Sequence, residues 1–279
     1  MFKIALTGGE GLVGSRIIEL LKGDFEFINL PQKVMDITDK EKVFQVIKEI
    51  NFDFFLHLAA YTNVSQAEVD KETCFKINVE GTKNVFEAVY FKKKCFIYIS
   101  TDFIFDGKNP PYFEDSKPSP VGVYGQSKYE GEKIVDGEGM IIRIAYPYRA
   151  EYRQKLDFFR KFKIQLEKKQ PLTLIGDSLM TPTFIDDIAF GLRYLIKNFS
   201  KEIFHLVGSN SLSPYEVGLS IAQTFNLDKN LIKKISFANF TKSRSYFPQY
   251  SVIKSKKNNF LRMKSFEEGL LEIKKQLKN

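Results

Sequence analysis

The residue types best suited to chemistry are a tyrosine and a lysine four positions apart, Tyr124 and Lys128, at the start of a helical pattern. At positions i and i+4 of a helix the two side chains project from one face. A free phenol has a pKa of about 10 and is a weak acid–base catalyst at neutral pH. A neighbouring ammonium favours the phenolate and is expected to lower that pKa. The pair therefore predicts proton transfer to or from a substrate oxygen.

A hydroxyl at a strand end strengthens this interpretation. Ser100-Thr101-Asp102 closes an apolar run that starts at Phe96. Ligands bind at the carboxyl ends of parallel strands, so the Thr101 hydroxyl is expected to hydrogen-bond a substrate carbonyl and stabilise charge on its oxygen. A second pair with the same spacing, Tyr90 and Lys94, lies at the end of a helical stretch and is given no role. Thr101, Tyr124 and Lys128 are the predicted catalytic residues.

Glycines 8, 11 and 14 follow the N-terminal apolar run and open a helical pattern. Gly8 permits a tight turn, Gly11 lets the backbone approach a pyrophosphate, and Gly14 allows close packing of helix on sheet. The free N–H groups of a helix N-terminus attract phosphates. This context predicts a nicotinamide dinucleotide, whose positive charge when oxidised would further lower the pKa of Tyr124. The tyrosine would then protonate a carbonyl oxygen as hydride reaches the carbon.

The choice between NADP and NAD depends on the end of the second strand. NAD-binding folds often place an acidic residue there, but this chain has Asn29-Leu30-Pro31-Gln32-Lys33 and no carboxylate before Asp36. Lys33 can neutralise a 2′-phosphate, so NADP is favoured and NAD stays open. Asp36 has two interpretations, a residue at the adenine ring or the cap of the following helix.

These residues need a scaffold, and the hydrophobic pattern predicts one. Strand-length runs that are continuously apolar alternate with amphipathic helical stretches, as in a parallel sheet that is buried on both faces. The strand candidates are Phe2 to Leu6, Phe25 to Leu30, Phe54 to Ala59, Phe96 to Thr101 and Met140 to Tyr146. The helix candidates between them are Gly14 to Leu21, Lys40 to Ile50, Thr73 to Tyr90 and Tyr124 to Val135. The order predicts an α/β fold with a doubly wound parallel sheet, the Rossmann fold, over residues 1–147.

The pattern changes after residue 147. A charged helical stretch, Tyr148 to Lys169, is followed by shorter elements. These are the strands Leu172 to Ile175 and Ile203 to Val207 and the helices Ile188 to Lys197 and Pro214 to Phe225. Residues 148–279 are expected to form a smaller C-terminal α/β substrate domain, intertwined with the first domain.

Composition excludes several function classes. The net charge is +8, but the lysines are scattered and match no nucleic-acid motif, so no nucleic-acid partner is expected. No run reaches the about 18 apolar residues of a membrane span and no signal peptide opens the chain, which predicts a cytoplasmic protein. Cys74 and Cys95 lack metal-ligand spacing, and His57 and His205 are isolated in apolar strands. No metal is expected.

The chain resembles the dTDP-4-dehydrorhamnose reductases, a family of the extended short-chain dehydrogenase/reductase superfamily. Ser100 to Gly107, STDFIFDG, is similar to the family signature STDYVFDG. His57 to Val64 with Ala67-Glu68 resembles the segment AAYTxVDxAE, and Asn78 to Thr82 resembles a superfamily helix that supplies an asparagine. Pro182-Thr183-Phe184 resembles the entry to the substrate domain.

The resemblance implies an activity, a substrate and a set of roles. The activity is NAD(P)H-dependent reduction of the keto group of a nucleotide-linked 4-keto-6-deoxy sugar, with Tyr124 as proton donor. The residues implied to contact the cofactor pyrophosphate are Gly11, Leu12 and Val13, and those implied at the adenine are Asp36 and Ile37. Ala59, Ala60 and Tyr61 are implied at the ribose and phosphates. Asn78, Tyr124 and Lys128 complete the implied cofactor contacts. Substrate contacts fall to Thr101, Asp102, Tyr146 and Arg244. A homodimer is a further expectation.

The chain also departs from the family. Asp177-Ser178 stands where an aspartate–glutamine pair is usual, and the C-terminal cluster is reduced to Arg244, Pro248, Gln249 and Ser251. Two alternatives stay open: a sugar-nucleotide epimerase, and a non-catalytic NADP-binding regulatory subunit similar to the methionine adenosyltransferase β subunit. Phe103 after Asp102 argues against a dehydratase, because dehydratases of the superfamily carry a glutamate there. The Tyr–Lys pair favours an enzyme.

Overall fold

A six-stranded parallel sheet in the order β2-β1-β3-β4-β5-β9 forms the centre of the computed structural model, which describes residues 1–242 and 246–278. Its strands are β1 (Lys3–Thr7), β2 (Glu26–Asn29), β3 (Phe54–His57), β4 (Cys95–Thr101), β5 (Met140–Ile144) and β9 (Ile203–His205). All six correspond to predicted strands, with some ends that differ by one or two residues. The predicted doubly wound sheet is confirmed.

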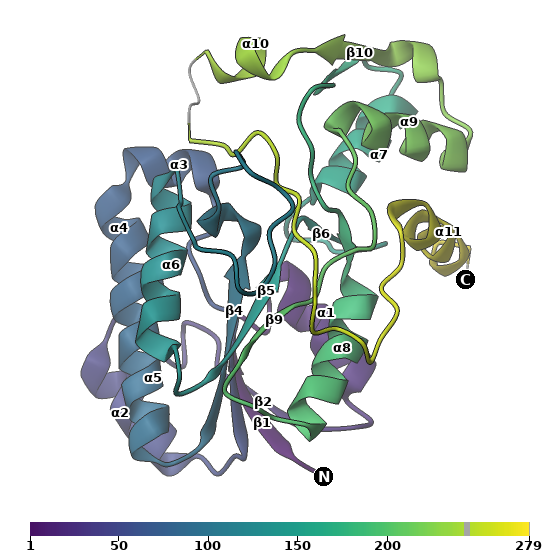
Figure 1. Ribbon diagram of the computed structural model, residues 1–279. Coiled ribbons are helices and arrows are strands. Elements are labelled where there is room, and N and C mark those ends of the chain that lie inside the picture. Colours follow the sequence, from purple (N-terminus) through teal and green to yellow (C-terminus); the bar gives the residue numbers. More distant parts are fainter. Residues whose placement is uncertain (243–245, 279) are drawn as a thin grey trace.

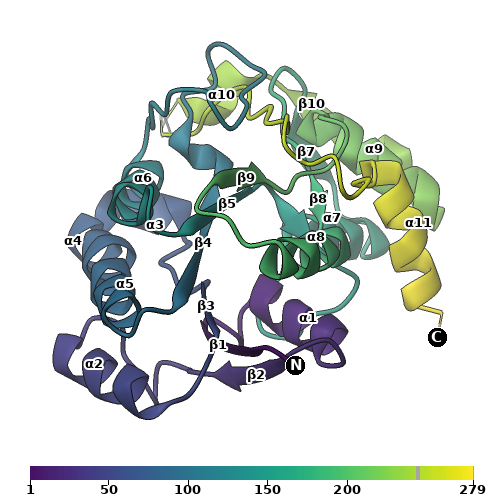
Figure 2. The ribbon, with the colours of Figure 1, turned by 60° about the horizontal axis from the view of Figure 1, so that its bottom comes forward.

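Helices cover both faces of the sheet (Figure 2). One face carries α1 (Leu12–Leu21) and α8 (Ile185–Lys197), and the other carries α2 (Lys40–Glu49), α5 (Thr82–Phe91) and α6 (Val123–Val135). Side chains alternate across a strand, so Ile4 and Leu6 of β1 pack with α1 and α8 while Ala5 packs with α2 and α5. Both faces are apolar, which explains why the strands read as continuous hydrophobic runs.

The helix predicted from Thr73 to Tyr90 is interrupted. After α3 (Val64–Val69), the structure has α4 (Lys71–Phe75), a π-helical stretch (Lys76–Gly81) and then α5. A Cβ on Gly81 would lie 2.7 Å from Cδ1 of Ile37, so the wider turn brings the chain against the loop that follows β2. Such π-helical turns are frequent at functional sites.

A second group of elements has its own core. Two short parallel pairs, β6 (Pro147–Tyr148) with β8 (Thr183–Phe184) and β7 (Leu172–Ile175) with β10 (Ile232–Ile235), accompany four helices. The helices are α7 (Phe158–Glu167), α9 (Pro214–Phe225), α10 (Phe237–Thr241) and α11 (Phe266–Gln276), with a 3₁₀ turn at Lys229–Leu231. Another 3₁₀ turn, Asp102–Ile104, directly follows β4 of the large sheet. Buried aromatic and aliphatic side chains from β6, α7, α9 and α11 fill the core between them.

The predicted helix from Tyr148 to Lys169 is wrong in its first part. Helix α7 begins only at Phe158, because the Asp157 carboxylate caps it by accepting the Arg160 N–H at 2.9 Å. Residues 149–157 form an irregular connection.

The chain crosses between the two groups more than once (Figure 1). Strand β9 and helix α8 follow β6 and β8 in sequence but belong to the large sheet and its covering layer. The division into residues 1–147 and 148–279 therefore stays a proposal about intertwined parts. Within the described residues, no helix is long and apolar enough to cross a membrane.

Candidate active site

The glycine loop turns sharply between β1 and α1. Gly8 has φ of +70°, and a Cβ there would lie 2.7 Å from the Ala59 nitrogen, so the loops after β1 and β3 touch through their backbones. The Gly11 N–H donates to the Gly8 carbonyl at 3.0 Å, and Gly11 is the N-cap of α1. The predicted contact residues Leu12 and Val13 form the first turn of α1, whose free N–H groups suit a phosphate. Gly14 is buried against Gly8, as close packing of helix and loop requires.

The loop after β3 is held from behind by Asn78. Its Oδ1 accepts the Tyr61 N–H at 2.7 Å, and its Nδ2 donates to the Tyr61 carbonyl at 3.2 Å and to Oγ of Ser127 at 2.9 Å. Ala59, Ala60 and Tyr61 are half-buried beside Gly8. Because Asn78 itself is buried and joins this loop to helix α6, it acts on the site through the Tyr61 backbone.

The alternative that Asp36 caps the next helix is wrong. Asp39 is the N-cap of α2, accepting the Lys42 N–H at 3.0 Å. Asp36 Oδ1 instead accepts the backbone N–H and hydroxyl of Thr38 at 2.9 and 2.8 Å, and these bonds lower the pKa of the carboxyl. Ile37 is buried, and its carbonyl accepts from the side-chain amide of Asn84. The turn thus fixes the Asp36 carboxylate in the loop that follows β2.

Helix α6 carries Tyr124 and Lys128, and a carboxylate fixes its start. Oε1 of Glu68, from α3, accepts the Val123 N–H at 2.7 Å. Gly122 before it leaves room, since a Cβ there would lie 2.9 Å from the same oxygen. Glu68 belongs to a motif quoted from the sequence, but no role was predicted for it. In the structure it caps helix α6, because it satisfies a helix N–H that has no partner within the helix.

The Thr101 and Tyr124 hydroxyls are hydrogen-bonding neighbours at the carboxyl edge of the sheet. Thr101 ends β4, is buried, and donates to Oδ1 of Asp102 at 3.0 Å. Burial raises the pKa of Tyr124 well above 10. The side-chain hydrogen bond with Thr101 opposes this rise in the pKa of Tyr124, and the Asp102 charge adds to it. The expected lowering of this pKa is therefore wrong for the protein alone, because burial outweighs the favourable contacts.

Lys128 lies deep below this edge, with 3% of its surface exposed. Its Nζ donates to the Ile99 carbonyl at 2.8 Å and lies 3.9 Å from the ring centroid of Tyr98. Burial lowers the pKa of Lys128 to about 7, with Glu132 opposing the change. His57 packs nearby between the hydroxyls of Thr7 and Thr82, at 2.7 and 3.2 Å. Burial, and then the Lys128 charge, lower the pKa of His57 to about 3, so the ring is a neutral packed side chain.

Asp102 links the site to the C-terminal part of the chain. Its carboxyl is buried, which raises its pKa to about 6 against the hydrogen bonds from Ser251 and Thr101. Ser251 is held by backbone bonds to Leu179 and by Thr181, whose Oγ1 donates to the Ser251 carbonyl at 3.1 Å. Sequence reasoning named Ser251 only as a remnant of a cluster, and no local signal shows its contact with a residue 149 positions away.

Aromatic rings pack around Phe103, next to Tyr124. The Phe103 ring centroid lies 5.6 Å from Tyr124, 6.2 Å from Tyr146 and 5.9 Å from Phe247. Tyr146 has a φ of +40°, a conformation that costs energy and is often found at functional sites. Its contact with the substrate stays a prediction. Phe103 and Phe247 were not predicted as site residues. Arg244 lies outside the described residues.

Comparison with known proteins shows which family, relatives and solved structures the chain resembles. The sequence profile of the family described as RmlD substrate binding domain matches residues 2–279. The chain is similar to a dTDP-4-dehydrorhamnose reductase of Aggregatibacter actinomycetemcomitans, 30% identical over 79% of this chain and 78% of the relative. It is also similar to the methionine adenosyltransferase 2 subunit beta of Rattus norvegicus, 27% identical over 84% of this chain and 75% of that protein.

Among solved structures, the fold matches a dTDP-4-dehydrorhamnose reductase from Bacillus anthracis in complex with NADP. The TM-score is 0.92, with 29% identity over 99% of both chains.

Proposed function

The chain belongs to the RmlD substrate binding domain family, and from this premise we propose that it reduces the keto group of a nucleotide-linked 4-keto-6-deoxy sugar with NADPH. The relatives named dTDP-4-dehydrorhamnose reductase and the NADP complex of one of them support this reaction. The chain's own support is the Thr101–Tyr124 pair beside a dinucleotide loop.

The residues present fit a nicotinamide dinucleotide. Only glycine fits at Gly8, where the two loops touch, and the first turn of α1 offers free N–H groups for phosphates. Leu12 and Val13 would hold the pyrophosphate, and Tyr61, fixed by Asn78, would lie on the ribose side. When bound, the cofactor supplies hydride to the carbonyl carbon.

The observation that carries the proposal is the position of the Tyr124 phenol beside the Thr101 hydroxyl at the carboxyl end of β4. The phenol, whose pKa burial raises, is protonated at neutral pH, as a general acid in a reduction must be. The phenol would give its proton to the substrate oxygen. The Thr101 hydroxyl, whose proton bonds Asp102 in the free protein, would turn that proton toward the substrate oxygen. Lys128 follows one turn later on the same helix, with its Nζ bonded to the Ile99 carbonyl.

The experiment is NADPH consumption with dTDP-4-dehydrorhamnose, measured for wild type and two variants. Tyr124→Phe removes the proton donor and keeps the ring that packs on Phe103, so turnover should fall by about 10²- to 10⁴-fold with little change in NADPH affinity. Thr101→Val should lower turnover less. Full turnover by Tyr124→Phe would contradict the proposed role.

A non-catalytic regulatory subunit is the second candidate, because the relatives include methionine adenosyltransferase β subunits. That function predicts NADP binding without turnover of any keto sugar. The complete Thr101, Tyr124 and Lys128 set favours the reductase. The same consumption assay separates the two.

Three further expectations belong to this proposal. A cytoplasmic site of action fits the free thiols of Cys74 and Cys95. A homodimer and a division of labour between residues 1–147 for the cofactor and 148–279 for the substrate remain predictions. The contact of Ser251 with Asp102 supports a substrate site built from both parts.

A further inference from the structure

The connection between β6 and α7 contacts both loops of the dinucleotide site. We name residues 149–157 the strap. The Tyr152 hydroxyl donates to the Glu10 carbonyl in the glycine loop, and Nζ of Lys155 donates to Oγ1 of Thr62 at 3.0 Å. Thr62 directly follows Tyr61 in the loop after β3. The strap therefore spans from one side of the predicted cofactor site to the other.

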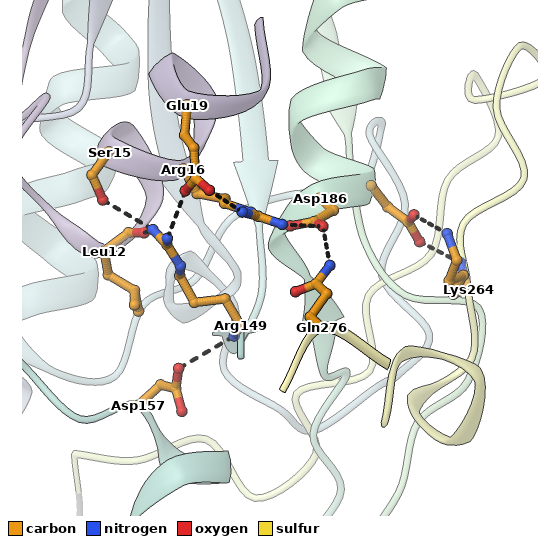
Figure 3. A network of polar contacts seen from close by, with 10 residues as sticks. Leu12, Ser15, Arg16, Glu19, Arg149, Asp157, Asp186, Lys264 and Gln276 are labelled. Carbon is orange, nitrogen blue, oxygen red and sulfur yellow. Dashed lines mark hydrogen bonds and ion pairs between the residues drawn. The ribbon is translucent and has the colours of Figure 1, made fainter. Parts of the chain in front are cut away.

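The first end of the strap is fixed to the helix that follows the glycine loop. Arg149 is buried, and its guanidinium donates to Oγ of Ser15 at 3.0 Å, to the Leu12 carbonyl at 3.3 Å and to Glu19 at 3.0 Å (Figure 3). Its backbone N–H donates to Asp157 at 3.3 Å. This end of the strap is thus hydrogen-bonded directly to the first turn of α1.

The second end is fixed to the start of α7. Asp157 accepts the N–H and Nε of Arg160, and the Arg160 guanidinium donates to the carbonyls of Tyr152 and Lys155. The Tyr152 ring also lies 5.7 Å from the guanidinium carbons of both Arg149 and Arg160. Arg149, Asp157 and Arg160 are buried, so the two ends of the strap are rigid.

The middle of the strap is different, because its side chains are exposed from Arg153 to Leu156. Two polar contacts, made by Tyr152 and Lys155, connect the strap to the glycine loop and the loop after β3. The Arg160 bonds join the strap only to helix α7. A segment with buried ends and a middle held by few contacts can open locally without unfolding the domain.

On the basis of the proposed function, we propose that the strap is a clamp for the dinucleotide. It closes over the cofactor between the glycine loop and the loop after β3, and Arg153 and Lys155 add positive charge against the phosphates. Cationic side chains bind phosphate oxygens strongly. Differences in affinity at one binding site come mainly from the rate of dissociation, so the clamp is expected to slow the release of the cofactor. The strap therefore has to open before the cofactor leaves.

The first test measures the release of NADPH by its own fluorescence in stopped flow, in a chain that contains no tryptophan. The double variant Tyr152→Phe/Lys155→Ala removes both contacts to the loops and should release NADPH about fivefold faster than wild type. The control is Lys161→Ala, an exposed lysine of α7, which should release at the wild-type rate.

The second test is limited trypsin digestion of the wild-type chain, followed by mass spectrometry of the fragments. NADPH should slow cleavage after Arg153 and Lys155 and leave cleavage after Lys168 and Lys169, which are exposed just beyond α7, unchanged. Unchanged release in the double variant, or unprotected strap bonds with NADPH bound, overturns the clamp while the reductase proposal stands. Absence of NADPH binding to the wild-type chain overturns both.

Discussion

Lys128 offers a sharp prediction, because its ammonium is buried with one hydrogen bond, to the Ile99 carbonyl, and one aromatic face, Tyr98. A pKa lowered from 10.5 to about 7 corresponds to about 5 kcal/mol at ~1.4 kcal/mol per unit. Below pH 7 the lysine is charged in both the folded and the unfolded state, so the full free-energy cost of burying its charge is present. Between pH 7 and 10.5 the folded state has lost the proton and the unfolded chain still binds it, so folding becomes more favourable as pH rises.

The perturbation is Lys128→Met, which removes the titrating group and keeps a side chain of similar length. From pH 6 to pH 9, the unfolding free energy of wild type should rise relative to that of the variant by about 2 to 3 kcal/mol. Urea unfolding at several pH values measures this difference, and Lys161→Met on the exposed face of α7 is the matched control. A difference between wild type and Lys128→Met that is independent of pH would refute the burial argument, and so would a difference of the opposite slope.

Three other variants test separate parts of the structure. Glu68→Ala removes the cap of helix α6 and should lower both the unfolding free energy, by about 1 kcal/mol, and the turnover. Glu68→Gln keeps the acceptor oxygen and should retain most of the stability and turnover of wild type. Urea unfolding and NADPH consumption measure the two effects. Gly8→Ala places a Cβ 2.7 Å from the Ala59 nitrogen in a residue with positive φ, and should weaken NADPH binding by about tenfold or more in a fluorescence titration. Arg143→Met leaves the Glu132 carboxylate buried without its bidentate partner and should cost about 3 to 5 kcal/mol, most of it recovered by adding Glu132→Leu. Equal stability of the single and double Arg143 variants would contradict that last prediction.

The sheet could be predicted because its strands are buried on both faces. Ile4 to Leu6 and Phe54 to Leu56 lie against helices on either side, so their hydrophobic runs are continuous and easily recognised. The glycine loop and the Tyr124–Lys128 pair could be predicted as well, since each depends on spacing within one short segment. The loop and the pair are therefore recognisable from a few neighbouring residues.

The parts that could not be predicted depend on contacts between distant segments. Ser251 reaches Asp102 only because the C-terminal segment folds back over the sheet edge. The π-helical stretch before α5 fits Ile37 against Gly81, which no helical periodicity reveals. The pKa of Tyr124 was expected to fall because the neighbouring ammonium is visible in the sequence, whereas the burial that raises the pKa belongs to the folded chain alone.

Transfer of the hydride is the central claim, and isotopic labelling tests it most directly. Wild-type protein would be incubated with dTDP-4-dehydrorhamnose and NADPH that carries deuterium in the transferred position of its nicotinamide ring. We predict a product with one deuterium on the former carbonyl carbon and one NADP⁺ formed per product. A chain that binds the labelled NADPH yet leaves the keto sugar unreduced, or that isomerises it without net NADPH consumption, would contradict the account.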